Sequence, residues 1–374
     1  MDLYNLLIRS ADYGAEKIEG NQHMQPGHNG PYHDPETPVR NTSHWTIIFL
    51  TAYQITGDDR YLRAVEKCLS YLMSDEVRPY GNTFCHRSVD GKDSCNGLIG
   101  QAWTIEALAT AGGELERQEP LDLAKSVFLQ HPFSDSLGAW KAVEIDGTIL
   151  GYDLTLNHQI WFAAAGAQIV LNASNADQIE QEVRGFLDEL PLNMHQYSSG
   201  LIYHNLRPRF DAQKYGILTI ENLKRRRIPM PILEYIRPET KRKLKKKAVG
   251  YHSFNLYGLA LLKQAYPDHA FWNSNSLLSA LEYGESKQFE TALDSNPYGY
   301  PYNCSGIEMA FATHIFENNR NQVQWWLSKQ IQFSYDSDTG AMIKNTEDRT
   351  TLASRIYEAT RLPNVTIDIN DERY

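Results

Sequence analysis

Hydrophobic residues recur at intervals of three and four along most of the chain, and short polar turns interrupt them. This spacing predicts amphipathic helices, and the turn residues mark where each helix ends. Most predicted helices form pairs joined by a few residues, such as the turn at 56–58. The predicted helices span 2–18, 43–55, 59–74, 97–111, 119–130, 155–171, 175–189, 252–265, 268–283, 304–317, 319–331 and 350–361.

The two helices of a pair differ in composition. Segments 97–111 and 155–171 are rich in Gly and Ala and apolar on most sides, whereas 61–73 and 177–190 carry a charged face. Helices that are apolar all round belong inside a fold, and one-sided helices belong outside. If the first helix is the outer partner of the last, six inner and six outer helices result. The sequence therefore predicts an all-α, single-domain (α/α)6 toroid over residues 1–374.

A polar cluster bearing Asn, His or Asp precedes or opens each predicted inner helix. An open solenoid of helix pairs would place its repeated residues in packing positions. Polar clusters repeated at one end instead favour a closed ring whose helices share a mouth. The six clusters are 41–45, 93–97, 153–158, 251–255, 302–306 and, less clearly, 348–351.

Three segments outside the helices are expected to line this mouth. Residues 23–40 form a loop rich in Gly, Pro, His and Asn, and 137–148 predict a β-hairpin that turns at Asp146-Gly147. Residues 191–250 form a long insertion, and long loops in compact domains often serve as lids or binding walls.

The insertion contains a basic segment, 224–247, with eleven Lys or Arg and two acidic residues, in a chain whose net charge is −10. Its cations alternate with a short apolar stretch, which suits peripheral contact with an anionic membrane surface or a lipid-linked substrate. A solvated, mobile insertion is the alternative. Because the rest of the chain is strongly acidic, we expect no nucleic-acid partner.

The remaining composition limits the class of protein. No apolar run is long enough for a membrane span, and the N-terminus lacks the features of a signal peptide. Four cysteines without a CxxC pair indicate a reducing, cytoplasmic location. Motifs for nucleotides and metalloproteases are absent, and His28, His33 and Asp34 lack a regular ligand spacing. We therefore predict no cofactor and no metal.

Two carboxylates are the first candidates for catalysis. Asp93 and Asp153 open the second and third predicted inner helices, where an N-cap is the alternative role. Carboxylates on neighbouring helices would titrate as a pair, and one of them would hold its proton more tightly. A proton held near a glycosidic oxygen is what general acid/base catalysis requires.

His158 and His252 are further catalytic candidates, because each opens an inner helix beside an Asn. Three tyrosines alternate along 298–302, and in an extended segment they would face one side for sugar stacking. The acids Glu106 and Glu308 lie within inner helices, where either could pair with Arg355. The candidate substrate-binding residues are Arg40, His44, Trp45, Asn96, Asn157, Asn255, Tyr298, Tyr300, Tyr302, Asn303, Arg355 and Tyr357.

Two family resemblances bear on function. The segment 153–164 (DLTLNHQIWFAA), with an Asp sixty residues earlier, resembles the unsaturated glucuronyl hydrolases. This resemblance implies that Asp153 is the acid/base, that Asp93 is its partner, and that a C4–C5 double bond in a uronic acid is hydrated. The loop 27–45 and residues 157–159 resemble the AglQ-type proteins of surface-glycan assembly clusters. This second likeness covers most of the chain. That likeness implies epimerase- or lyase-like modification of uronic acids.

The sequence thus predicts an enzyme acting on acidic oligo- or polysaccharides, free or lipid-linked. Hydrolysis through Asp153 and Asp93 is the first hypothesis. A lyase or uronate C5-epimerase that uses a His or Tyr base is the alternative, and a non-catalytic glycan-binding protein is the second alternative.

Overall fold

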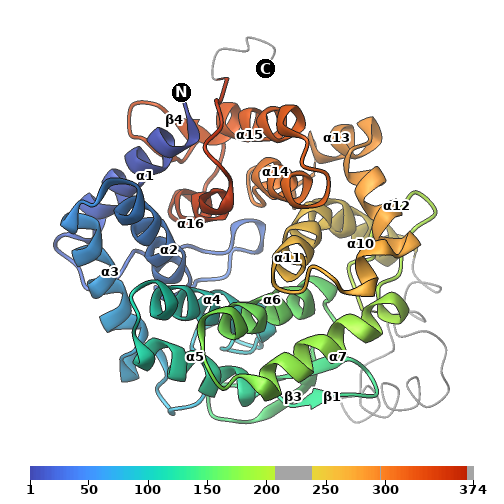
Figure 1. Cartoon of the computed structure of the whole chain (residues 1–374), viewed down its shortest axis with the longest axis horizontal. Helices are drawn as coiled ribbons and strands as arrows, with labels where there is room; N and C mark the ends of the chain where they lie inside the picture. Colours follow the sequence, from blue (N-terminus) through green and yellow to red (C-terminus); the bar gives the residue numbers. More distant parts are fainter. Residues whose placement is uncertain (207–237, 295, 369–374) are drawn as a thin grey trace.

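The computed structural model describes residues 1–206, 238–294 and 296–368. Six helices form an inner ring in which each contacts the next, and η4 closes it by contacting both α14 and α2 (Figure 1). The predicted (α/α)6 toroid is confirmed. The inner elements are α2 (Val39–Thr56), α4 (Gly97–Glu114), α6 (Leu156–Asn172), α11 (His252–Ala265), α14 (Ser305–Phe316) and α16 (Arg349–Ser354), which continues as the 3-10 turn η4 (Arg355–Arg361).

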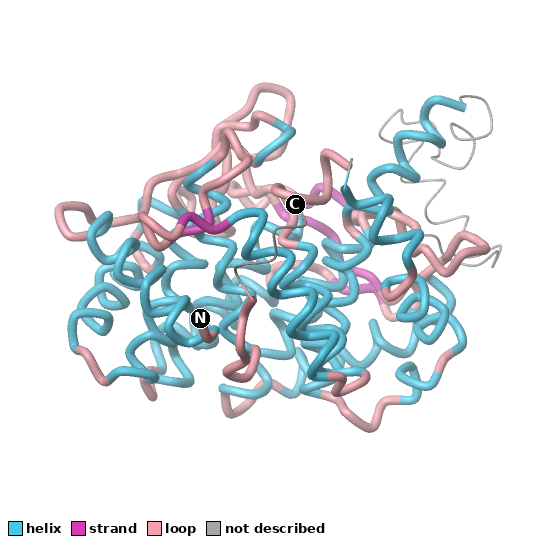
Figure 2. Tube along the Cα trace, turned by 90° about the horizontal axis from the view of Figure 1, so that it is seen from above, coloured by secondary structure: helices cyan, strands magenta, loops and turns pink. Residues whose placement is uncertain are grey.

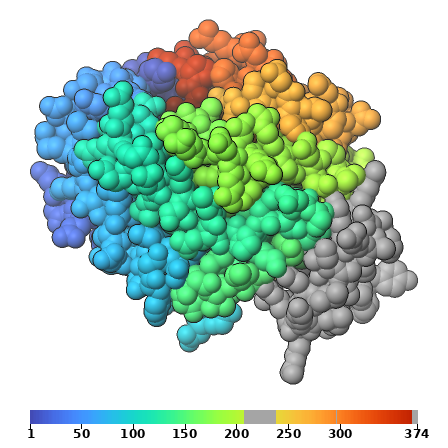
Figure 3. Space-filling view, turned by 60° about the horizontal axis from the view of Figure 1, so that its bottom comes forward, coloured from blue at the N-terminus to red at the C-terminus, as the bar shows by residue number. Residues whose placement is uncertain are grey.

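Outer helices alternate with the inner ones along the chain and surround them. In Figure 3, side chains of the blue, teal and yellow-green segments form a continuous surface on one side of the ring. The outer helices are α1 (Leu3–Ile18), α3 (Asp59–Leu72), α5 (Gln118–Leu129), α7 (Asp177–Asn193), α12 (Asn275–Gly284) and α15 (Arg320–Ser334).

The two ends of the described chain lie together. The amide of Leu3 donates to the carbonyl of Val365 (3.0 Å), and that of Ile367 donates to the carbonyl of Met1 (2.7 Å). Helix α1 also contacts η4 and packs on α2. The first helix is therefore the outer partner of the last inner element, as the sequence predicted.

Burial follows the predicted division between inner and outer helices. Every residue of α4 from Leu98 to Ala109 is buried. Helix α3 instead buries one stripe, which includes Tyr61, Val65 and Leu72. An inner helix must tolerate neighbours on all sides, so small residues are favoured where helices approach closely. A Cβ on Gly166 of α6, for example, would lie 2.7 Å from a ring carbon of Phe128 on α5.

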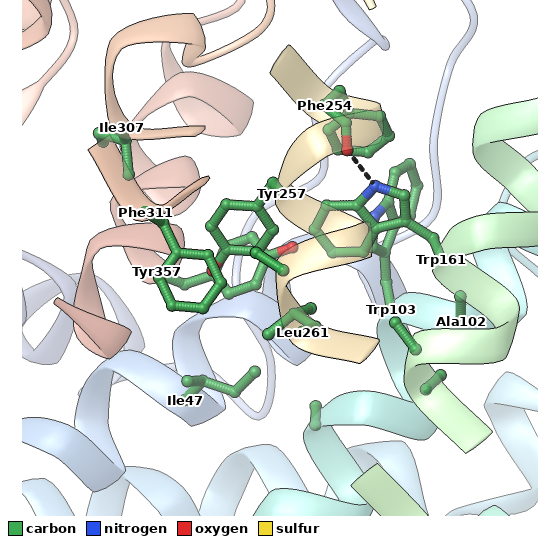
Figure 4. Packing of buried hydrophobic residues seen from close by; sticks show 14 of the residues in the cluster. Ile47, Ala102, Trp103, Trp161, Phe254, Tyr257, Leu261, Ile307, Phe311 and Tyr357 are labelled. Atoms are coloured by element: carbon green, nitrogen blue, oxygen red, sulfur yellow. Dashed lines mark hydrogen bonds between the residues drawn. The ribbon is translucent and has the colours of Figure 1, made fainter. Parts of the chain in front are cut away.

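Aromatic side chains fill the centre of the ring below its mouth (Figure 4). The Trp161 ring stacks on Phe254 with centroids 4.4 Å apart, and its Nε1 donates to the Phe254 carbonyl at 3.0 Å. Tyr257 lies parallel to Trp161 at 5.3 Å. The ring is thus a packed core with a floor, and no channel passes through these side chains.

The longer loops and the strands lie on one side of the ring (Figure 2). The predicted hairpin is present as β2 and β3, with Lys141 opposite Tyr152 and Gly147 in the turn at φ 88°. The smaller elements are η1 (Gly30–Tyr32), η2 (Asp75–Val77), β1 (Phe133–Ser134), β2 (Ala139–Val143), β3 (Ile149–Tyr152), α10 (Pro238–Gly250), η3 (Ala270–Asn273), α13 (Lys287–Asp294), β4 (Tyr335–Asp336) and β5 (Ala341–Met342).

Two local predictions differ from the structure. Helix α2 begins at Val39, one turn before the predicted start at 43. Residues 298–302 form consecutive turns and not an extended segment, so the alternating tyrosines do not share one side. Pro297 and Pro301 fix the backbone of this segment and remove two amide donors, which is unfavourable for a strand.

The basic segment 224–247 is only partly within the described residues. Residues 224–237 lie outside them, and 238–247 belong to α10, where Lys241, Arg242, Lys243, Lys245 and Lys246 are exposed. The helices of the described ranges include none with the length and apolar character needed to cross a membrane.

Trp45 provides a test of the packing between α1 and α2. A Cβ on Gly14 of α1 would lie 2.3 Å from the Trp45 ring, which is 2% exposed. We expect Trp45→Ala to lower the free energy of unfolding by about 3–5 kcal/mol, measured by urea denaturation. Trp325→Ala, at a 39%-exposed position of α15, is the control and should cost about 1 kcal/mol or less. Stability unchanged in Trp45→Ala, with weakened ligand binding, would contradict this assignment to the core.

Candidate functional site

A cavity of about 270 Å³ opens where the N-terminal ends of the inner helices meet. Residues at or just before the start of five inner helices reach it, and Arg355 reaches it from the junction of α16 and η4. The loop before α2, the segment before α4 and the end of α10 complete the lining. The lining residues are Asn29, Tyr32, Asp34, Arg40, Arg87, Lys92, Asn96, Ile99, Trp103, Thr155, Asn157, His158, His204, Lys247, Tyr251, Phe254, Tyr302, Asn303 and Arg355.

His158 lines the cavity and forms a hydrogen-bonded pair with Asp153. Nδ1 of His158, in the first turn of α6, lies 2.7 Å from Oδ2 of Asp153, and Oδ1 of Asp153 accepts from the Thr155 amide at 3.1 Å. The His158 side chain is 25% exposed and the Asp153 side chain 11%. A carboxylate on Nδ1 fixes the ring so that Nε2 is the nitrogen available to a ligand. Nε2 has no hydrogen-bond partner among the described residues.

The first turn of α4 holds this pair in place. Asn96 and Gly97 both have positive φ, at 56° and 59°. The turn directs the amide of Leu98 to Asp153 Oδ2 at 3.2 Å. A Cβ on Gly97 would lie 2.6 Å from Asp153 Oδ2 and 3.2 Å from His158 Nδ1. Both the backbone conformation and the close approach therefore require glycine at this position.

Asp93 caps the same turn from the other side. Its Oδ1 accepts from the Gly97 amide at 2.8 Å, and its Oδ2 accepts from Arg87 at 2.9 Å. Asp93 and Asp153 thus bind consecutive amides of α4, as expected for carboxylates of neighbouring clusters. Asp93 is not among the residues that line the cavity.

Neither carboxyl has the raised pKa that the sequence argument expected of one of them. Burial alone would raise the pKa of Asp153, but His158 and the amides of Thr155 and Leu98 lower it to about 2. For Asp93, burial is likewise outweighed by Arg87 and the Gly97 amide, so its pKa is also lowered. Each carboxylate has its own cation and amide donors, and the two have no need to share a proton.

The cavity is rich in cations. Arg40, Arg87, Lys92, Lys247 and Arg355 line it, against the single carboxylate of Asp34. Helix N-termini add partial positive charge at the same place. The helix amides and the cationic side chains, four of which also pair with carboxylates, can bind a ligand that carries an anionic group.

Two of these cations are held rigidly at the floor. The guanidinium of Arg40 lies 4.1 Å above the Trp103 ring and binds Glu36 Oε1 at 2.9 Å. Arg355 is 2% exposed and lies 5.4 Å from the centre of the Phe254 ring. Aromatic faces and ion pairs fix both guanidinium groups before any ligand binds.

Arg355 lies between two buried acids. It binds Glu308 at 2.8 Å and Glu358 at 2.9 Å, and burial raises the pKa of Glu308 to about 7 and that of Glu358 to about 8. One guanidinium can stabilise only one carboxylate fully, so one acid keeps its proton near neutral pH. The prediction that Glu308 pairs with Arg355 is confirmed, whereas Glu106 pairs with Arg361.

Three tyrosine hydroxyls form a chain along one wall. Tyr32 Oη lies 2.9 Å from Tyr251 Oη, which donates to Tyr302 Oη at 3.4 Å, and Tyr302 Oη donates to Asn29 Oδ1 at 3.0 Å. Burial raises the pKa of the Tyr251 and Tyr302 hydroxyls, so they stay protonated at neutral pH. Both O–H groups already donate within the chain, and protonated hydroxyls are poor bases.

The side-chain amide of Asn157 is buried at the cavity without a hydrogen-bond partner among the described residues. Its side chain is 1% exposed, it lines the cavity, and neither amide atom has a hydrogen-bond partner within the described residues. A buried amide without partners costs free energy, which a ligand or a water molecule in the cavity would offset. His204 Nδ1 is likewise buried without a partner.

The structure brings seven of the predicted site residues to the cavity. Six of them were predicted to bind substrate, and the seventh, His158, was predicted to be catalytic. They are Arg40, Asn96, Asn157, His158, Tyr302, Asn303 and Arg355.

Other predicted residues lie deeper in the ring. His44 stacks on Tyr357 at 4.1 Å, below the cavity, and both side chains are buried. His252 uses both ring nitrogens within the protein, at the Ala280 carbonyl (2.9 Å) and the Ile202 amide (3.4 Å). Asn255 donates to the Tyr251 carbonyl. None of these four side chains lines the cavity.

The tyrosine run divides between different surroundings. Tyr302 reaches the cavity, and Tyr298 packs beside Tyr32 with ring centroids 5.9 Å apart. Tyr300 lies against Phe333 of the outer helix α15.

Sequence reasoning missed several lining residues that come from loops. Tyr32 and Asp34 belong to the segment before α2, and Arg87 and Lys92 precede α4. His204 reaches His158 because residues 204–206 pair with 154–156. The loops were expected at the mouth, but no periodicity indicates which of their side chains turn inward.

No group of three or more His, Cys, Asp or Glu side chains is placed to hold a metal ion in the described ranges. The site is therefore defined by a histidine–aspartate pair, cations and hydroxyl groups.

Comparison with known proteins adds three likenesses, and no family model matches the sequence. The chain is 45% identical over 362 residues to archaeal glycosylation protein Q of Haloferax volcanii, covering 96% of this chain and 97% of that protein. Its structure is similar to D-mannose isomerase, with a TM-score of 0.61, 13% identity and 96% of each chain covered. It is also similar to unsaturated glucuronyl hydrolase from Bacillus sp. GL1, with a TM-score of 0.59, 9% identity and 95% of each chain covered. At these identities the structural likenesses show a shared fold.

The lowered pKa of Asp153 predicts a dependence of stability on pH. Its folded-state pKa of about 2 lies below the ordinary aspartate value of 3.8, so ionised Asp153 stabilises the fold above pH 4 and this contribution is lost towards pH 2. We expect Asp153→Asn to cost about 2 kcal/mol at pH 7, and the cost to fall by about 1 kcal/mol at pH 3. Urea unfolding of both proteins at each pH tests this, with Asp90→Asn as an exposed control. A difference that stays constant from pH 7 to pH 3 would contradict it.

Proposed function

Because the chain belongs to the family of archaeal glycosylation protein Q, we propose that it is a glycan-processing enzyme that acts on an acidic sugar. The carrying observation is the His158–Asp153 pair in a cavity lined by five cations. The cations support an anionic substrate, and the pair supports proton transfer. The structural neighbours are carbohydrate-active enzymes.

The proposed reaction begins with removal of the proton on C5 of a uronic acid residue. Nε2 of His158 takes the proton, and the electron pair of the broken C5–H bond moves into the carboxylate to give an enediolate. Asp153 stays ionised, holds the ring and stabilises the imidazolium that forms. Cations at the substrate carboxylate stabilise the developing second negative charge.

Two outcomes are open to this intermediate. Return of a proton to C5 from the opposite face gives the epimer. If the bond between C4 and a substituent oxygen breaks instead, the electron pair forms a C4–C5 double bond and the leaving oxygen takes a proton. Epimerisation and elimination therefore share the step that His158 would perform.

Hydrolysis through Asp153 is less favoured by the site. A general acid must carry a proton at the working pH, and the pKa of Asp153 is lowered to about 2. Hydrolysis remains the second candidate because Asp93 and Asp153 bind consecutive amides of α4. That convergence suits a pair of carboxylates acting on one bond.

The test is solvent exchange at C5. Uronate oligosaccharides incubated with the protein in D₂O should gain deuterium at C5, followed by NMR and mass spectrometry. His158→Asn should slow exchange about 10²–10⁴-fold, because the base is lost while ring size and polarity are nearly kept. Absorbance of the unsaturated product, measured in parallel, separates elimination from epimerisation.

His314→Asn is the matched control, because His314 lies in the last turn of α14, at the end of that helix away from the cavity. It should exchange at the wild-type rate. A different result would reject proton abstraction and favour hydrolysis. In that result C5 does not exchange, unsaturated substrates lose their double bond, and Asp93→Asn abolishes this loss.

A further inference from the structure

Four of the five cations in the cavity already have a carboxylate partner. Their charges are balanced within the protein, so they contribute orientation and hydrogen bonds more than net charge. The pairs are Arg40 with Glu36 (2.9 Å), Arg87 with Asp93 (2.9 Å), Lys92 with Asp34 (2.5 Å) and Arg355 with Glu308 (2.8 Å).

Lys247 differs from these four. Among the described residues no carboxylate lies within ion-pair distance of its Nζ. Its ammonium instead lies 4.9 Å from the centre of the Tyr32 ring and 5.4 Å from that of Tyr298. Burial, followed by the charges of Lys243 and Lys92, lowers its pKa. A half-buried ammonium beside two other cations is an unfavourable arrangement that an anionic ligand would relieve.

Lys247 also lies on the reactive side of the cavity. The pKa of His204 is lowered to about 3 by burial and then by the charges of Lys247 and His158. Lys247, His204 and His158 all line the same cavity. An anionic group bound by Lys247 would lie near the wall that carries His158, which suits a substrate whose reacting carbon bears the anion.

We propose that Lys247 is the anchor for the substrate's anionic group and determines the preference for acidic over neutral sugars. The inference rests on the proposed function, since it assumes a sugar ligand. One uncompensated cation matches one negative charge, so the group it fits is a sugar carboxylate and not a phosphate dianion. The ring of Tyr32, which lines the cavity beside the ammonium, offers apolar surface to the sugar.

In this proposal α10 positions the residue that binds the anionic group. The helix lies outside the alternation of inner and outer helices, beside α11 and α13, and its last turn brings Lys247 to the cavity. The inner ring would then supply proton transfer and the floor, while the insertion supplies recognition of charge.

The experiment compares binding of methyl glucuronide and methyl glucoside, which differ in the carboxylate, by titration calorimetry at low salt. Wild-type protein should bind the glucuronide about tenfold or more tightly than the glucoside. Lys247→Met should bring this ratio close to one, and Lys247→Arg should keep a preference because the charge remains. Raising the salt concentration should reduce the wild-type ratio.

Lys246→Met is the matched control. It removes the same charge from the neighbouring exposed position, and the Lys246 carbonyl keeps its bond from Asn296. The control should retain the wild-type ratio. Lys247→Gln is a second variant in case Lys247→Met fails to fold, which circular dichroism would reveal.

Two results would overturn the proposal in different ways. If Lys247→Met and Lys247→Gln fold and keep the wild-type ratio, Lys247 is not the anchor, and the floor arginines hold the anion. If wild-type protein shows no preference for the glucuronide, the acidic-sugar part of the proposed function fails as well. Glucose 6-phosphate should also be titrated. If it binds more tightly than the glucuronide, and Lys247→Met removes this difference in affinity, the group bound by Lys247 is a phosphate and not a carboxylate.

Discussion

The inner helices all begin at one end of the ring, so their unpaired first-turn amides surround a single cavity. Few of these helices are capped by their own N-cap side chain; α4, α6, α11 and α14 have no such bond. Neighbouring segments provide acceptors instead, including Asp153 for α4, the His204 carbonyl for α6 and Gln330 for α14. Satisfying the first turn of one helix therefore fixes a side chain or backbone from another segment against it. The position of Asp153, and through it that of His158, follows from this requirement.

The charged groups of the site are likewise satisfied by neighbouring side chains and amides. Each buried guanidinium is paired with a carboxylate and rests on an aromatic ring, so the floor is rigid and nearly neutral. The imidazole of His158 is fixed by an ionised carboxylate that itself accepts from two amides. Preorganised groups of this kind lose little free energy to reorganisation when charge develops on a ligand. The exceptions, Asn157 and Lys247, are the groups left for a ligand to satisfy.

Periodicity was sufficient to predict the helices and their division into two rings, because inner and outer positions impose different burial on every residue. Periodicity could not predict how far each side chain lies from the mouth of the ring. Helix α2 starts one turn earlier than predicted, which brings Arg40 to the mouth and moves His44 and Trp45 one turn down. Asp153 and His158 were both identified, but their contact depends on Gly97 of another helix. Lys247 and His204 lie within the long insertion 191–250, where no local pattern indicates which side chains reach the cavity.

The meeting of the two chain ends has a consequence for biosynthesis. The last inner element, η4, contacts α2 more than three hundred residues earlier in the sequence, and residues 365–367 pair with the first three. A nascent chain on the ribosome can stack its first five inner helices in order, yet the gap between α14 and α2 stays open until this segment emerges. Arg355 enters the cavity in the same step. The floor of the cavity is thus complete only after nearly the whole described chain has been translated, and until then the cavity of a growing chain is unfinished.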